Sequence, residues 1–314
     1  MIRILQNVFL RLLRRPKDLL AMTSLRAQRS NLDFIVDYVA LTKPRLVSLV
    51  LLSTTVGFYL AHPIGISSFS FVVTLIATSL VAGGSMALNQ FLERDIDSKM
   101  IRTQNRPLPA GRLAPKEALW FGSLASLLGF FIFISFINVA AALLAFVTWA
   151  SYLFIYTPLK GKTSLSTIVG AVPGALPPMI GWAGARGNVD FQAFLLFMII
   201  FFWQMPHFLA IAWMYRADYE RAGQPILSVI DREGKFVARQ MIVNMCALMP
   251  VSLLPTIFGL TGTVYFFGAF GLGLGFAAAI IFAATNLDLR ARYVLRVSVA
   301  YLAALLILMV IDKI

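Results

Sequence analysis

One amide and two carboxylates recur at four-residue intervals near the end of a long apolar run, at Asn89, Glu93 and Asp97. A helix that continues through this stretch places all three on one face, because residues four apart lie one above another. Amide and carboxylate oxygens suit Mg²⁺, which often holds phosphate groups at the same time. The spacing therefore predicts a magnesium site for a diphosphate, with a solvated helix end as the alternative. Asp95 lies off this face and is expected to pair with a nearby arginine.

Basic side chains follow these acids within one predicted loop. Arg102 and Arg106 are expected to neutralise phosphate oxygens, because the planar guanidinium fork matches phosphate geometry. Arg106 stands directly before the rigid segment Pro107-Leu108-Pro109, which would fix its position. Lys99 is a further candidate for the diphosphate. Taken singly, each of these charges could instead serve only to orient the chain in a membrane.

A second polar group follows a later apolar run. Asp218, followed by Tyr219, is predicted to form a second edge of the metal site. His207 lies eleven residues earlier, so that one continuous helix would put both on the same face about 16 Å apart. A histidine inside an apolar run is either a hydrogen-bonded core residue or a functional group that contacts a metal or transfers a proton.

A third apolar run ends in Tyr156-Thr157-Pro158-Leu159-Lys160. Lys160 and the following Lys162 would reach a diphosphate held at the same rim as Glu93, and Tyr156 lies beside them in the sequence. The alternative is that these lysines only mark the cytoplasmic side of the membrane.

The elements that must position these residues are membrane helices. Hydrophobic residues make up 59% and charged residues 13% of the 314 residues, which excludes an ordinary soluble domain. A run of about 20 apolar residues crosses a bilayer. Nine such runs are predicted, at residues 46–61, 68–90, 117–136, 138–156, 165–184, 190–214, 237–258, 263–285 and 291–311. Backbone groups must be satisfied inside lipid, so the fold is predicted to be an all-α bundle.

Charge sets the expected orientation. With nine spans, all of the 27 Lys and Arg residues except Arg186 and Lys313 fall on one side. This asymmetry predicts a cytoplasmic N-terminus. The net charge of +13 is therefore mostly a topology signal, and a nucleic-acid partner is not expected. Residues 165–184 contain several prolines and glycines, which predicts a kinked span with close backbone approaches to a helix or a ligand.

Residues 1–37 are predicted to form a basic cytosolic segment, and residues 38–314 the membrane domain. The first segment suits an amphipathic tail on anionic lipid, with a mitochondrial transit peptide as the alternative. The one cysteine, Cys246, lies within a predicted span, so disulfides are not expected.

The pattern Asn89-x-x-x-Glu93-x-x-x-Asp97, followed by Arg102-Thr103 and Arg106-Pro107-Leu108-Pro109, resembles the first signature of the UbiA superfamily of intramembrane prenyltransferases. Four further stretches are similar to its protohaem IX farnesyltransferase (haem O synthase) subfamily. They are residues 156–160, 174–182 (Gly-Ala-Leu-Pro-Pro-Met-Ile-Gly-Trp), 203–208 (Trp-Gln-Met-Pro-His-Phe) and 218–227. Together these similarities cover roughly residues 40–311.

The resemblance implies nine helices around a central cavity, a Mg²⁺ cofactor, and farnesyl diphosphate and haem B as substrates in a lipid bilayer. It implies that Mg²⁺ is held by Asn89, Glu93, Asp97 and Asp218, and that the diphosphate is bound by Arg102, Arg106, Lys160, Tyr156 and Lys99. His207 would orient the haem, contact its iron or assist a water molecule. Members acting on quinone precursors tend to carry aspartate at the positions of Glu93 and His207. The basic pair that commonly follows Tyr-Thr-Pro-Leu-Lys is Gly161-Lys162 here, so one positive charge is missing.

The product would be haem O, on the way to haem A for a terminal oxidase, with a haem A synthase or an oxidase assembly factor as a possible partner. The expected location is a bacterial cell inner membrane, with the mitochondrial inner membrane as the alternative. A UbiA-type enzyme acting on an aromatic acid such as 4-hydroxybenzoate is the nearer alternative function. A membrane transporter is the distant one, because the acids gather at one rim and no charged path crosses the spans.

Overall fold

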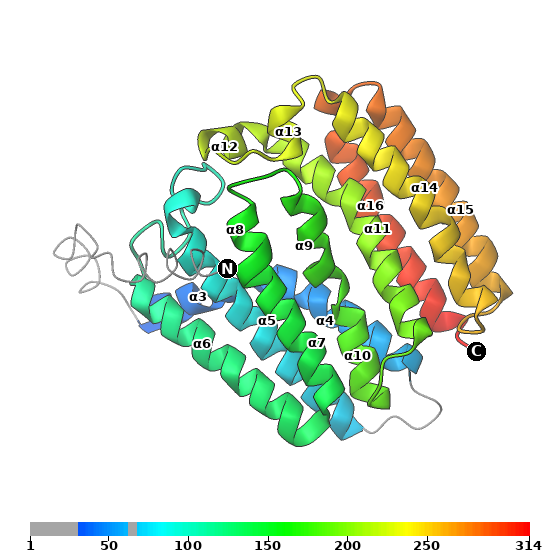
Figure 1. Cartoon of the computed structure of the whole chain (residues 1–314), viewed down its shortest axis with the longest axis horizontal. Helices are drawn as coiled ribbons and strands as arrows, with labels where there is room; N and C mark the ends of the chain where they lie inside the picture. Colours follow the sequence, from blue (N-terminus) through cyan, green and yellow to red (C-terminus); the bar gives the residue numbers. More distant parts are fainter. Residues whose placement is uncertain (1–30, 62–67) are drawn as a thin grey trace.

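The computed structural model describes residues 31–61 and 68–314, and these form helices joined by loops, with one isolated β-bridge between Thr261 and Lys313 (Figure 1). Nine helical segments of this part are long and apolar enough to cross a membrane. They are α4 (Pro44–Ala61), α5 (Ser68–Asp97), Pro115–Ile137, Val139–Leu159, Ser166–Arg186, α11 (Phe191–Met214), α14 (Lys235–Ile257), α15 (Thr263–Ala284) and α16 (Leu287–Ile311). The predicted all-α bundle of nine spans is confirmed, with ends shifted by only a few residues except at α5.

The third and fourth spans meet at Asn138, as predicted. The third is α6 (Pro115–Ile132) with a π-helical turn, Phe133–Ile137. Asn138 leaves the helical conformation and its side chain accepts a hydrogen bond from the Ala141 amide at 2.8 Å, which starts α7 (Val139–Ala150). A second π-helical turn, Ser151–Tyr156, then leads into the short α8 (Thr157–Leu159).

The fifth span is broken, as its prolines and glycines predict. α9 (Ser166–Ala175) ends before Leu176, and α10 (Pro177–Arg186) begins with a proline at a position that needs no amide hydrogen. α10 packs on α4 so closely that a β-carbon at Gly57 would strike the Pro178 carbonyl, and one at Gly181 the Thr54 carbonyl. Gly57 and Gly181 therefore serve helix–helix packing.

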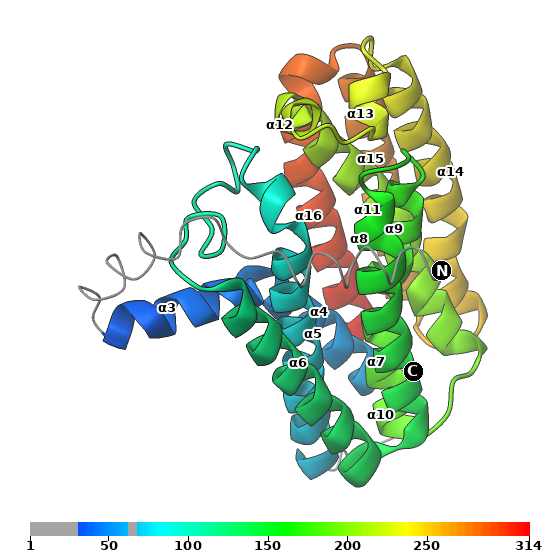
Figure 2. The same cartoon turned by 60° about the vertical axis from the view of Figure 1, so that its left-hand side comes forward.

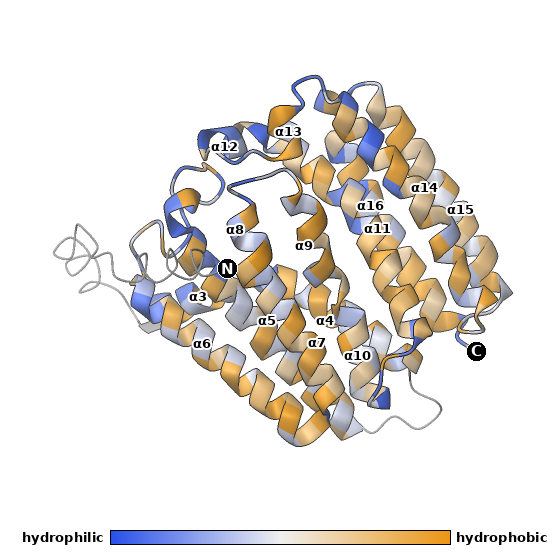
Figure 3. Cartoon of the chain, in the orientation of Figure 1, coloured by the Kyte–Doolittle hydropathy of each residue, from blue (hydrophilic) through white to orange (hydrophobic). Residues whose placement is uncertain are grey.

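Hydrophilic residues gather at one end of the bundle, at the top in Figure 3. This end, called the basic end below, contains the basic loop (residues 98–114), the turn after α8, and the two short helices α12 (Arg216–Arg221) and α13 (Leu227–Ile230). α5, α8 and α11 all finish there, so side chains far apart in the sequence meet at one rim (Figure 1).

A helix lies across the bundle axis beside this end. α3 (Asn31–Thr42) projects sideways in Figure 2 and exposes apolar side chains, among them Leu32, Ile35 and Val36. On its other face, Asp37 accepts from the guanidinium of Arg112 in the basic loop at 3.0 Å. The predicted division between residues 37 and 38 falls within α3, while residues 1–30 of the predicted tail lie outside the described part. The division itself stays a prediction.

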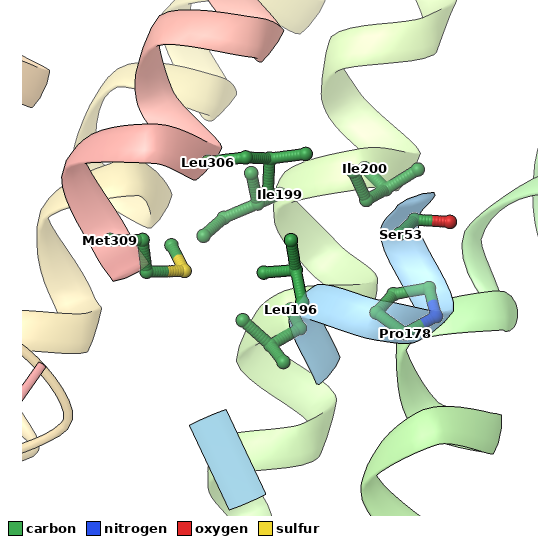
Figure 4. Close-up of a pocket in the computed structure, with 8 residues that line it drawn as sticks. Ser53, Pro178, Leu196, Ile199, Ile200, Leu306 and Met309 are labelled. Atoms are coloured by element: carbon green, nitrogen blue, oxygen red, sulfur yellow. The ribbon is translucent and has the colours of Figure 1, made fainter. Parts of the chain in front are cut away.

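A small apolar hollow lies between α4, α10, α11 and α16 (Figure 4). It is lined by Ser53, Val56, Pro178, Leu196, Ile199, Ile200, Leu306 and Met309. Apart from the hydroxyl of Ser53, the side chains that line it are hydrocarbon or thioether, so the hollow suits apolar contents.

Candidate active site

The three predicted ligands on α5 turn inward. α5 continues without a break to Asp97, so the predicted shared face of Asn89, Glu93 and Asp97 forms. The three residues are 1%, 4% and 3% exposed, respectively, although they lie near the end of the helix. Buried carboxylates are costly unless charges or hydrogen bonds compensate them. Their burial therefore demands partners.

Each of the three has a basic partner from a different element. Lys160, after α8, donates to both oxygens of Glu93 at 2.9 and 3.2 Å. Arg106 of the basic loop donates to Asp97 Oδ2 at 2.7 Å. The third partner, Lys43 between α3 and α4, donates to Asn89 Oδ1 at 3.1 Å. The inner face of α5 is thus a set of oxygen atoms that already attracts three basic groups.

Lys43 is a site residue that sequence reasoning missed, since it was counted only as an orienting charge. It is followed by Pro44, as Arg106 is by Pro107, and it adopts a positive φ of 50° that turns the chain between two helices. A basic residue held before a proline in a helix–helix turn was the available signal. Nothing in the local sequence shows that this turn packs beside Asn89.

The two lysines differ in how their partners affect them. Burial, assisted by the positive charge of Arg106, lowers the pKa of Lys43 to about 7. Burial acts in the same direction on Lys160, but the adjacent Glu93 carboxylate outweighs it and raises the pKa of Lys160 well above its usual value. The hydrogen-bond partner of Lys43 is the neutral amide of Asn89, which does not compensate the positive charge of a buried ammonium group. A bound anion would compensate this charge.

Residues 152–160 complete this wall of the site. Thr157 accepts from Asn89 Nδ2 at 3.1 Å and donates to the Tyr152 carbonyl at 2.8 Å, which points the amide oxygen of Asn89 toward Lys43. The Tyr156 ring lies 5.5 Å from Lys160 Nζ. Tyr156 and Lys160 are therefore brought together beside Glu93, as the sequence motif suggested.

The basic loop starts at the end of α5 and folds back so that Arg106 contacts this helix again. Thr103 Oγ1 donates to the Asp97 carbonyl at 2.8 Å, and the Arg106 amide donates to the Thr103 carbonyl at 3.0 Å. These bonds curl residues 97–106 so that the guanidinium meets the Asp97 carboxylate. Lys99 is exposed. Asp95 is also exposed and lies 3.8 Å from Arg94, which confirms the predicted pairing with an arginine.

Asp218 contacts the same loop from the other side. Its carboxylate accepts from the backbone amides of Ile101 and Arg102, each at 3.3 Å, and from the Arg221 side chain. Desolvation opposes ionisation, but these hydrogen bonds, led by Arg221, lower the pKa of Asp218. The Arg102 guanidinium lies 4.9 Å from the centre of the Tyr215 ring. α12 is thereby clamped onto the basic loop.

In the described ranges, no three His, Cys, Asp or Glu side chains lie close enough together to hold a metal ion. Asp218 is brought to the loop that carries Arg102 and Arg106, and not into a ligand cluster with Glu93 and Asp97. The roles assigned to these residues stay predictions.

The expectation of one helix from His207 to Asp218 is wrong. α11 ends at Met214, Tyr215 leaves helical geometry with φ −110° and ψ 20°, and α12 then starts in a new direction. The turn is anchored by Asp288, which accepts from Trp213 at 3.1 Å and from Arg216 at 2.6 Å. His207 stays inside the span, half-buried, with its Nδ1 atom 2.8 Å from Ser298 Oγ on α16.

Known proteins resemble this chain in sequence. Residues 50–309 match the profile of the UbiA prenyltransferase family. The chain is 45% identical over 287 residues to a protein from Solibacter usitatus named protoheme IX farnesyltransferase, covering 88% of this chain and 98% of the relative. A protein of the same name from Salinibacter ruber is 42% identical over 277 residues, with the same coverage.

Solved structures share the fold at low sequence identity. A digeranylgeranylglyceryl phosphate synthase superposes with a TM-score of 0.75 at 15% identity, covering 88% of this chain and 98% of that one. A UbiA homolog from Archaeoglobus fulgidus bound to DMAPP and Mg²⁺ gives 0.63 at 14% identity, covering 85% and 99%. On the family profile and the two relatives, this chain belongs to the UbiA prenyltransferase family.

Proposed function

We propose that this protein transfers the farnesyl group of farnesyl diphosphate to a vinyl group of haem B, with addition of water, to give haem O. Relatives that are 39–45% identical over 88% of the chain carry the name protoheme IX farnesyltransferase, which supports haem as the acceptor. The buried oxygen face of α5, surrounded by Lys43, Arg106 and Lys160, supports a site for a diphosphate. That face is the observation that carries the proposal.

The donor set of this face fits Mg²⁺. It offers one carboxamide and two carboxylates, the oxygen ligands that this ion prefers, and each of them already has a basic group against it. Asn89, Glu93 and Asp97 would hold the ion, while Asp218 would keep the basic loop in place through the Ile101 and Arg102 amides. Bound Mg²⁺ would stabilise the negative charge of the departing diphosphate.

The basic groups of the chain would act on the same charge. With Asp97 and Glu93 engaged by bound Mg²⁺, Arg106 and Lys160 would be released from these carboxylates to bind phosphate oxygens. Lys43 needs no such exchange, because its partner is neutral. Arg102 and Lys99 are exposed on the basic loop and would contact the incoming diphosphate first. Tyr156, which lies beside Lys160, would contact the diphosphate from the wall formed by residues 152–160. Preorganised positive groups of this kind stabilise charge that develops on the leaving group.

The bond changes follow from these roles. The bond between C1 of the farnesyl group and oxygen breaks, and the diphosphate leaves with the electron pair. The vinyl group of haem attacks the allylic cation and forms the new carbon–carbon bond. Water adds to the resulting cation and loses a proton, which gives a hydroxyethylfarnesyl side chain. Apolar spans around the reacting carbons keep other water molecules away from the first cation.

The decisive assay supplies purified protein in lipid nanodiscs with Mg²⁺, farnesyl diphosphate and haem B, and identifies the product by mass. We expect haem O from the wild type and at least about a hundredfold slower formation of it by Glu93→Gln. An aromatic acceptor, 4-hydroxybenzoate, is offered in a parallel reaction. A prenylated aromatic acid together with unchanged haem B would contradict the proposal.

We further propose that the basic end faces the cytoplasm of a bacterial inner membrane, because positively charged loops stay on that side. Haem O would then pass to a haem A synthase or an oxidase assembly factor. A single cysteine in the basic loop, introduced into a Cys246→Ser background, tests the orientation. It should react with a membrane-impermeant maleimide in inverted vesicles and not in spheroplasts, and the reverse result would refute the orientation.

A further inference from the structure

α11 and α16 pack side by side, and a short polar seam joins them within the membrane-spanning part of both helices. The seam consists of Trp203 and His207 on α11 and Ser298 on α16. Trp203 Nε1 donates to the Ser298 carbonyl at 2.7 Å, and His207 Nδ1 lies 2.8 Å from the Ser298 hydroxyl. Polar groups at membrane depth are costly and usually functional. The seam therefore calls for an explanation beyond helix packing.

The hydrogen bonds of Ser298 determine which nitrogen of His207 carries its hydrogen. The Ser298 hydroxyl donates its single hydrogen to the Leu295 carbonyl at 2.8 Å, so toward the imidazole it acts as an acceptor. The hydrogen of a neutral His207 ring then lies on Nδ1, and Nε2 keeps its lone pair. Among the described residues, the ring makes no hydrogen bond at Nε2.

The ring is also held in orientation. Trp203 stacks on it with ring centres 4.9 Å apart, and Phe208 meets it edge-on at 5.6 Å. Ser298 is fully buried, whereas His207 is only half-buried. A histidine with one nitrogen tied to an oxygen acceptor and the other left bare is the arrangement by which proteins prepare an imidazole to bind a metal.

The seam is separate from the diphosphate rim. His207 lies seven residues before the end of α11, about 10 Å along the helix. It also lies seven residues from Ile200, where the same two helices line the apolar hollow of Figure 4. Glu93, Asp97 and Asp218 make their contacts at the basic end, so their charges do not explain the seam.

We propose that Nε2 of His207 binds the iron of the haem substrate as an axial ligand, and that Ser298 is a positioning residue that holds the ring in the required tautomer. The inference rests on haem being the acceptor, as proposed above. An axial bond at the iron fixes the plane of the porphyrin while its edge, which bears the vinyl groups, stays free to react. It also distinguishes an iron porphyrin from a metal-free one.

The test is a binding titration on the full chain in nanodiscs, with haem B or metal-free protoporphyrin IX and no farnesyl diphosphate. Wild-type protein should give the visible spectrum of histidine-ligated iron. His207→Ala should lose this spectrum, regain it on addition of imidazole, and bind metal-free protoporphyrin as the wild type does. Ser298→Ala should weaken haem affinity about tenfold, and Ser298→Thr should restore it.

Ser252→Ala is the matched control. Ser252 is also buried in a membrane span, and its hydroxyl donates to the carbonyl three residues earlier, Met249, at 2.8 Å, but it faces no imidazole. It should leave the spectrum unchanged. An unaltered iron spectrum in His207→Ala, or equal losses for haem and metal-free porphyrin, would overturn the inference. If the wild type still makes haem O in that case, the proposed function stands without the iron ligand.

Discussion

The acids on α5 and the acid on α12 are both buried at the basic end, but they are stabilised in different ways. Glu93 and Asp97 face basic side chains that arrive from other parts of the chain. Asp218 instead accepts hydrogen bonds from two backbone amides of the basic loop and from the Arg221 side chain on its own helix. The first arrangement is held by charge, and under the proposed function its carboxylates would exchange their basic partners for a metal ion. The second shapes a loop. Buried acidity alone therefore does not identify a ligand; the nature of its partner does.

The largest effect should come from removing a basic partner on the α5 side. Lys160→Met leaves Glu93 buried without its counter-charge, and such a loss costs about 3–5 kcal/mol. Arg221→Met on the α12 side should cost under about 1 kcal/mol, since Arg221 is 47% exposed and the solvent screens its charge. Thermal unfolding of both variants in nanodiscs measures the contrast. Equal losses of stability in the two variants would show that the two sides do not differ. Partial recovery of stability in a Lys160→Met, Glu93→Gln double variant would show that the unpaired Glu93 charge causes the loss.

Turnover should show the same contrast. Glu93→Gln and Asp97→Asn keep the shape of the side chain but remove charge, and each is expected to lower the rate of haem O formation about a hundred- to thousandfold. Asp218→Asn keeps one acceptor for the loop amides and should lower it only about tenfold. The rates come from product mass at saturating Mg²⁺. A loss in Asp218→Asn as large as that in Glu93→Gln would make Asp218 an equal member of the metal site.

Lys43 tests whether the α5 face binds the diphosphate itself. Lys43→Met should raise KM for farnesyl diphosphate about tenfold, the loss expected for one charge-assisted hydrogen bond. The turnover number and the affinity for haem should stay near wild type. Lys43→Arg, which keeps the charge, should recover most of the affinity. A fall in turnover number at unchanged KM would instead place Lys43 in the chemical step.

The smallest effect is expected at Asp95, the acid beside the face. It is 63% exposed and its arginine partner is 3.8 Å away, a geometry that contributes little. Asp95→Asn should change turnover by less than about twofold and leave stability unaltered. It serves as the charge-matched control for Asp97→Asn. A strong effect would mean that the metal site extends around the helix beyond its inner face.

Hydropathy was enough to predict the nine spans, because transfer into lipid dominates every local preference. The break at Asn138 and the kink before Pro177 were also readable, since capping and proline effects are local. Helical periodicity correctly placed Asn89, Glu93 and Asp97 on one inward face.

What could not be read depends on contacts between distant segments. The turn at Tyr215 is fixed by Asp288, more than 70 residues away in the sequence, so an unbroken helix to Asp218 looked equally acceptable. Lys43 meets Asn89 across 46 residues, and Ser298 meets His207 across 91. No periodicity within one span reveals which residue of another span will face it.

The helix α3, which lies across the bundle axis, connects the basic loop to its surroundings. Arg112 joins Asp37 of α3 to the carbonyl of Asn105, one residue before Arg106. The opposite side of α3 presents Leu32, Ile35 and Val36, which need acyl chains to cover them. A detergent micelle offers a curved and fluctuating surface where a bilayer offers a flat one. Kinetic constants of this enzyme therefore belong to a particular lipid environment, and head-group composition becomes a variable to control alongside substrate concentration.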